Sequence, residues 1–123
     1  MIRFECDYAE GAHPKVLEAL VKTNFEQTPG YGVDGHCAHA QELIREACED
    51  PLANVYFVTG GTPANVTVIA SLLRPYQGCV CCKSGHINVH EAGAVEATGH
   101  KVIGLDGKDG KLSADTLRDY RES

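Results

Sequence analysis

Residues 54–66 read NVYFVTGGTPANV, and this stretch decides the fold. It opens with a short, continuously apolar and β-rich run at 54–58, which is typical of a strand that is buried on both faces. Two glycines then lead into a segment that favours a helix at 63–73, with Thr62 in the capping position and Pro63 in the first turn. We therefore predict a strand, a tight glycine loop and a helix, the unit from which parallel α/β sheets are built.

Helices and strands alternate on both sides of this unit. The other expected elements are helices at about 13–26, 36–49 and 89–98, a last helix opened by Ser113, and strands at 79–82 and 101–105. Short loops rich in glycine join them, so we expect an α/β fold with a mainly parallel sheet and helices on both faces. Three strands are few for such a sheet, and we therefore expect the domain to be incomplete.

Composition argues against several classes of function. Eleven lysines and arginines stand against seventeen acids, and the basic residues are scattered, so nucleic acid is not an expected partner. No apolar run approaches the roughly 20 residues that span a bilayer, and the acidic start is unlike a secretory leader. We expect no membrane association and a cytoplasmic location, with the six cysteines reduced and buried.

Gly60, Gly61 and Thr62 form a candidate anion site. Glycines let the backbone approach a ligand closely, and the start of a helix presents unpaired N–H groups at its positive end. A phosphate or carboxylate is the expected ligand, although a capped helix after a tight loop explains the same residues. Because neither GxxxxGK nor GxGxxG is present, a single phosphate fits better than a nucleotide.

The stretch CVCCKSGH at 79–86 offers thiols and an imidazole, which are ligands that zinc prefers. In a strand, however, Cys79 and Cys81 point to one side and Cys82 points to the other, so the three do not converge as in a zinc knuckle. We predict strand packing for these cysteines and no metal site, with zinc as the alternative.

Three further side chains are candidates for function. His86 follows the carboxyl end of a strand, the edge where α/β sheets bind ligands, although a surface loop histidine is the alternative. Glu91 stands five residues later, where it either orients a ligand or favours the helix dipole. Tyr31 lies on the glycine-rich loop YGVD, whose composition suits a binding edge or a simple turn.

The motifs, taken in order, resemble the low-specificity threonine aldolases and related β-eliminating lyases, which are pyridoxal phosphate enzymes of fold type I. The matching stretches are FECDY, EGAHPKVLEAL, PGYGVD, VYFVTGGTPANV, SGHINVHEAGAVEATGHKV and DGKL, and they cover almost the whole chain. The resemblance implies that residues 1–30 form an amino-terminal arm and helix, and that 31–123 begin the large, cofactor-binding domain. It also implies a homo-oligomer, either a dimer or a tetramer.

The resemblance further implies that the enzyme to which this segment belongs cleaves L-threonine-like or L-allo-threonine-like β-hydroxy amino acids to glycine and an aldehyde. His86 would stack on the pyridine ring of the cofactor and assist proton transfer. The phosphate would be held by Gly60, Gly61 and Thr62, with Asn65 close by.

Substrate contacts are expected from three positions. Cys6 stands where the family usually has serine, and Tyr31 would reach the active site of a partner subunit. Glu91 is grouped with them as a candidate contact of the amino acid substrate.

The resemblance implies that some of the family's catalytic groups lie beyond the stretch that matches this sequence. They are the Schiff-base lysine, the aspartate that pairs with the pyridine nitrogen, and the arginines that hold the substrate carboxylate. None of the lysines here, Lys83 included, stands in the context of that lysine, so we expect the 123 residues alone to be inactive and poorly soluble. The alternatives are another fold type I enzyme (a β-eliminating lyase, a cysteine desulfurase or an aminotransferase) and a non-catalytic, truncated binding module.

Overall fold

The computed structural model describes residues 5–6 and 8–122 of the chain. Its contacts divide it into two compact units, Met1–Val55 and Tyr56–Ser123, which are described separately. The expected boundary at residue 30 concerns the role of the amino-terminal segment rather than its packing, and it stays a prediction.

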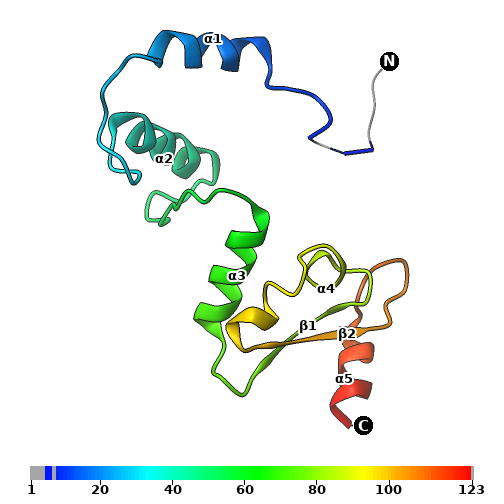
Figure 1. Cartoon of the computed structure of the whole chain (residues 1–123). Helices are drawn as coiled ribbons and strands as arrows, with labels where there is room; N and C mark the ends of the chain where they lie inside the picture. Colours follow the sequence, from blue (N-terminus) through cyan, green and yellow to red (C-terminus); the bar gives the residue numbers. More distant parts are fainter. Residues whose placement is uncertain (1–4, 7, 123) are drawn as a thin grey trace. The chain divides into compact units, whose positions relative to one another are not determined.

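Among the described residues of the amino-terminal unit, the regular structure consists of two helices (Figure 1). α1 spans Pro14–Thr23, with the proline in its first turn. α2 spans Gly35–Ala47 and is capped by Asp34, whose Oδ1 accepts a hydrogen bond of 2.9 Å from the Cys37 N–H. This bond to the charged form lowers the pKa of the Asp34 carboxyl. Both helices predicted for this part are confirmed, with ends that differ by a few residues.

The carboxyl-terminal unit combines helices with a parallel two-stranded sheet. Its elements are α3 at Gly61–Leu72, β1 at Gly78–Cys82, α4 at His86–Val89, the short 3-10 helix η1 at Glu96–Thr98, β2 at Lys101–Leu105 and α5 at Ala114–Glu122. β1 pairs with β2 in parallel, and Figure 1 shows α4 next to the two strands it contacts. The strands predicted at 79–82 and 101–105, the parallel pairing and the α/β class are therefore confirmed.

The small core of the described chain lies in this second unit. Val95 and Val102 are buried there, together with two polar residues, Glu91 and His100. His100 has a hydrogen-bond partner, because its Nδ1 lies 3.3 Å from the Gln77 carbonyl oxygen. Glu91 is part of the candidate site described below.

The strand predicted at 54–58 is wrong, because the structure has irregular backbone there. A strand needs a neighbouring strand to pair its N–H and C=O groups, and the described residues offer this apolar run none. Thr62 is not the cap of α3 either. The helix starts at Gly61 after Gly60, and none of the described side chains caps it.

The helix predicted at 89–98 is also wrong. α4 ends at Val89, and Ala92 and Gly93 then take left-handed φ angles of 51° and 73°, which no α-helix accommodates. Within the rest of the predicted range, the one helical segment is the 3-10 turn η1.

The six cysteines are free thiols, but the prediction that they are buried is wrong. Cys48 is exposed and the other five are half-buried. Three of them, Cys79, Cys81 and Cys82, lie on β1, which has one neighbouring strand among the described residues to cover it. None of the helices described is long and apolar enough to cross a membrane.

Candidate functional site

The carboxylate of Glu91 joins two elements of the carboxyl-terminal unit. Its Oε1 accepts a hydrogen bond of 2.6 Å from Asn65 Nδ2, on the second turn of α3. The same oxygen lies 2.8 Å from Nδ1 of His86, the first residue of α4. The Glu91 side chain is 0% exposed and that of His86 is 65% exposed, so a buried acid holds an accessible imidazole.

These bonds keep Glu91 ionised. The hydrogen bond with His86 is the main cause that lowers the pKa of the Glu91 carboxyl, and the Asn65 bond acts in the same direction, while burial opposes both. An ionised carboxylate accepts hydrogen bonds and donates none. Its two partners must therefore be the donors.

A tight turn after β1 places His86. The Gly85 N–H donates to the Cys82 carbonyl oxygen at 2.7 Å, so α4 begins directly after the strand. A Cβ at position 85 would lie 2.9 Å from that same oxygen, which explains the glycine. Gly85 is assigned no role in the sequence analysis. The signal that could have found it is a glycine between a strand and a candidate ligand.

The amino terminus of α3 presents free donors. Gly60 supplies no capping side chain, and the N–H groups of Gly61 and Thr62 have no hydrogen-bond partner within the described residues. Pro63 carries no N–H, and Ala64 already donates to the Gly60 carbonyl oxygen at 3.3 Å. Two backbone N–H groups and the Thr62 hydroxyl therefore remain for an anion, which the helix dipole also favours.

The predicted site residues fall into two groups. The residues predicted to hold the cofactor, at 60–62, 65 and 86, lie in the carboxyl-terminal unit together with Glu91. Hydrogen bonds there connect Asn65, Glu91 and His86. Cys6 and Tyr31 belong to the amino-terminal unit, and their substrate contacts stay predictions. Tyr31 is fully exposed and has a left-handed φ of 65°, which is uncommon for a bulky residue.

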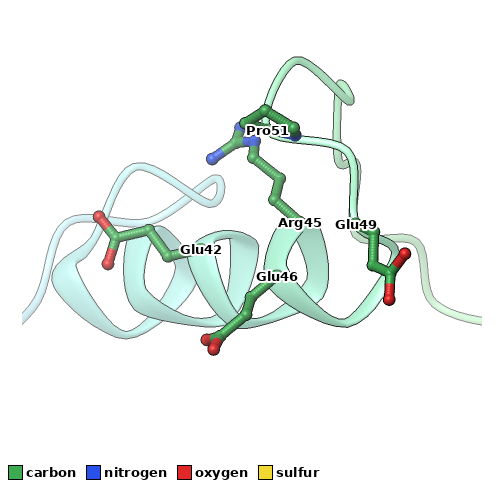
Figure 2. A pocket seen from close by; sticks show the side chains of 5 residues that line it. All are labelled: Glu42, Arg45, Glu46, Glu49 and Pro51. Atoms are coloured by element: carbon green, nitrogen blue, oxygen red, sulfur yellow. The ribbon is translucent and has the colours of Figure 1, made fainter.

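Other polar groups of the described residues are less suited to holding a ligand. Lys83 Nζ is 2.8 Å from Asp106 Oδ2 in an exposed ion pair. In the part of the chain that the structure describes, histidine, cysteine and acidic side chains nowhere gather in threes that could hold a metal ion. A surface hollow on the amino-terminal unit is lined by Glu42, Arg45, Glu46, Glu49 and Pro51. Figure 2 shows its carboxylates pointing away from one another, so they do not converge on a ligand.

Known proteins resemble this chain over nearly all of its length. The family described as β-eliminating lyase matches residues 5–122. The low specificity L-threonine aldolases of Pseudomonas sp. (strain NCIMB 10558) and Pseudomonas aeruginosa are each 29% identical over 119 residues, which cover 95% of this chain and 34% of theirs. The solved structure of Leishmania major threonine aldolase has a TM-score of 0.88 and 44% identity, over 92% of this chain and 33% of that chain. The chain thus spans about a third of the length of these relatives.

Proposed function

This chain belongs to the β-eliminating lyase family, and on that premise we propose that it forms part of the cofactor site of a threonine aldolase that uses pyridoxal phosphate. The family match confirms the resemblance carried by the motifs, and the solved aldolase shares the fold. The proposed reaction cleaves a β-hydroxy amino acid, such as L-threonine or L-allo-threonine, to glycine and an aldehyde. The single observation that carries the proposal is the buried Glu91 carboxylate bonded to both Asn65 and His86.

The described residues fit the two ends of pyridoxal phosphate. The phosphate would be held by the free N–H groups of Gly61 and Thr62 and by the Thr62 hydroxyl, close to Gly60. The exposed ring of His86 would stack on the pyridine ring. Asn65 ties the phosphate-binding helix to the histidine through Glu91. The cofactor, when bound, supplies the electron sink for breaking a bond at the substrate's Cα.

His86 is also suited to move a proton. Its Nδ1 is occupied by Glu91, so the substrate hydroxyl would give its proton to Nε2. The charged imidazole that results would be stabilised by the buried carboxylate next to it, which favours the proton transfer.

Assembly, location and substrate contacts complete the proposal. We propose a cytoplasmic homo-oligomer in which Cys6 contacts the amino acid substrate and Tyr31 reaches the active site of a partner subunit. The free thiols agree with a reducing compartment, and the exposed Tyr31 is available to a partner subunit.

Substituting Thr62 tests the phosphate contact. Thr62→Val keeps the shape of the side chain but removes its hydroxyl donor, and a hydrogen bond to a charged group contributes about 1.5–3 kcal/mol. We expect the Kd of pyridoxal phosphate, measured by titrating the absorbance of the cofactor, to rise roughly tenfold or more. Thr67→Val on the exposed side of α3 is the matched control and should leave the Kd unchanged. Equal Kd values for the two variants would contradict the assignment.

A non-catalytic binding module is the second candidate, and the ion pair of Lys83 with Asp106 favours it for these 123 residues. We propose that they bind the cofactor without a covalent bond. Borohydride reduction followed by mass spectrometry should show no adduct, and an adduct at one lysine would overturn this.

The reaction itself is tested by giving the full-length gene product L-allo-threonine and measuring glycine. If the full-length product bound the cofactor but produced no glycine, the lyase proposal would fail and the binding module would remain.

A further inference from the structure

The buried side chain of Glu91 has a more specific role than contact with a substrate. We propose that Glu91 is a positioning residue, which holds the neutral ring of His86 in the tautomer protonated at Nδ1 and so leaves Nε2 as its proton acceptor. This inference rests on the proposed function, in which His86 receives the proton of the substrate hydroxyl.

The hydrogen-bond chemistry of the pair fixes where the ring proton sits. Nδ1 of His86 is 2.8 Å from Glu91 Oε1, which is a full hydrogen bond. The carboxylate is ionised, since its partners lower the pKa of Glu91, and it can only accept. Nδ1 must therefore carry the hydrogen. In the neutral ring the lone pair then lies on Nε2, for which the described residues provide no hydrogen bond.

Asn65 fixes the orientation of the carboxylate itself. Its amide donates to the same oxygen, Oε1, at 2.6 Å, so this oxygen is held between α3 and the first residue of α4. Oε2 of Glu91 is buried and has no hydrogen-bond partner within the described chain. The two donors to Oε1 are thus the local support of a buried charge, and removing either is costly.

Burial of the Glu91 carboxylate favours its bond with His86 over a bond with water. Because the Glu91 side chain is 0% exposed, water cannot compete with His86 for its oxygen. The ring of His90 lies 5.3 Å from that of His86, between centroids, at an angle of 52°. A ring rotation that takes Nδ1 away from Glu91 would remove one of the two hydrogen bonds that compensate the burial of the acid.

This arrangement suits a proton acceptor. The β-hydroxyl of the substrate gives its proton to Nε2, while Nδ1 keeps its own proton and its bond to Glu91. The imidazolium therefore forms without any ring rotation, and the buried negative charge stabilises it. A carboxylate plays the same orienting role for histidine in serine protease triads.

Nitrogen NMR of the unmodified chain provides the first test. Two-bond proton–nitrogen correlations distinguish the two neutral tautomers, and they are recorded at a pH above which the His86 signals no longer change. The signals of His86 are assigned by their loss in His86→Asn. We expect Nδ1 to be the protonated nitrogen. A ring protonated mainly at Nε2 would overturn the proposal before any variant of Glu91 is made.

Glu91→Gln provides the second test, since it keeps the shape of the side chain and removes the acceptor-only carboxylate. We expect the tautomer ratio of His86 to move toward that of free histidine in solution. Glu96→Gln removes a charge from an exposed position nearby and should leave the ratio unchanged. An unchanged ratio in Glu91→Gln, with amide spectra that show a folded chain, would contradict the proposal. If that variant does not fold, the tautomer ratio of His86 is measured in Glu91→Asp, which shortens the acid. The same outcomes then support or contradict the proposal.

These measurements need no cofactor, so they can fail independently of the proposed function. Loss of cofactor binding with an intact Nδ1 tautomer would remove the lyase assignment but keep the positioning role. In the loaded full-length protein, Glu91→Gln should lower kcat far more than it raises KM for L-allo-threonine. Equal changes in both constants would argue against a role in proton transfer.

Discussion

Glu91 brings a negative charge into the unit that also buries Val95, and a buried charge is stable only if hydrogen bonds replace the lost water. His86 and Asn65 supply those bonds. The same bonds that make the acid tolerable hold the imidazole and connect it to α3. At this residue, structural support and proposed function are therefore the same interaction, and a change of protonation should affect both.

The acid sensitivity of the fold follows from Glu91. Its pKa is lowered from 4.5 in the folded chain, chiefly by the bond with His86, so its ionisation stabilises the fold above about pH 4.5. This stability is lost as the pH falls through the lowered value. We expect the urea midpoint of the wild type to exceed that of Glu91→Gln near pH 6, and the difference to shrink below about pH 4.5. Glu96→Gln should follow the wild type throughout. A difference that is constant from pH 6 to pH 3 would contradict this reading.

The residues of the site could be named from the sequence, but their contacts could not. His86 and the GGT turn stand at the ends of local patterns, which sequence reasoning can recognise. The bond between Asn65 and Glu91 joins residues 26 positions apart, and no spacing rule connects them. Local patterns therefore leave Glu91 as a candidate substrate contact, whereas the structure gives it two hydrogen-bond partners within the protein.

At the scale of elements, helices could be predicted from local signals, whereas strands depend on a pairing partner. Asp34, Pro14 and Ser113 start their helices through caps and first-turn preferences, so α1, α2 and α5 could be predicted. The apolar run at 54–58 has strand composition but no strand beside it among the described residues. Strand formation depends on neighbours, and composition alone cannot supply them.

The turn between β1 and α4 provides a test at this scale. A methyl group in Gly85→Ala would meet the Cys82 carbonyl oxygen at 2.9 Å, and neither backbone segment can move without disturbing the strand or the start of α4. We expect a lower thermal midpoint and altered His86 signals in the nitrogen spectrum. Gly61→Ala is the matched control, because a Cβ there meets nothing within 4 Å. If Gly85→Ala left the midpoint and the His86 signals of the wild type intact, the turn would not be what places His86.

At the scale of the whole chain, apolar surface exceeds what the fold buries. Among the described residues the buried hydrophobic side chains are Val95 and Val102, while the apolar stripe of α1 is open. Leu17 is 51% exposed, Leu20 is 59% exposed and Val21 is 74% exposed. Contiguous apolar surface of this kind promotes association, which agrees with the low solubility expected from the sequence.

Lysine substitutions on the α1 stripe should reduce this association. In Leu17→Lys/Val21→Lys two exposed apolar side chains are replaced by good helix formers, so α1 is preserved. The net charge of −6 moves toward zero, which weakens the repulsion between chains, so any reduction must come from the lost apolar surface. We expect the wild type to sediment faster as its concentration rises and to bind a hydrophobic dye, and the variant to do both less. Glu18→Gln/Ala19→Lys makes the same change of charge on the polar face of α1, and it should associate at least as strongly as the wild type. If both variants associated equally, the stripe of α1 would not be the surface responsible.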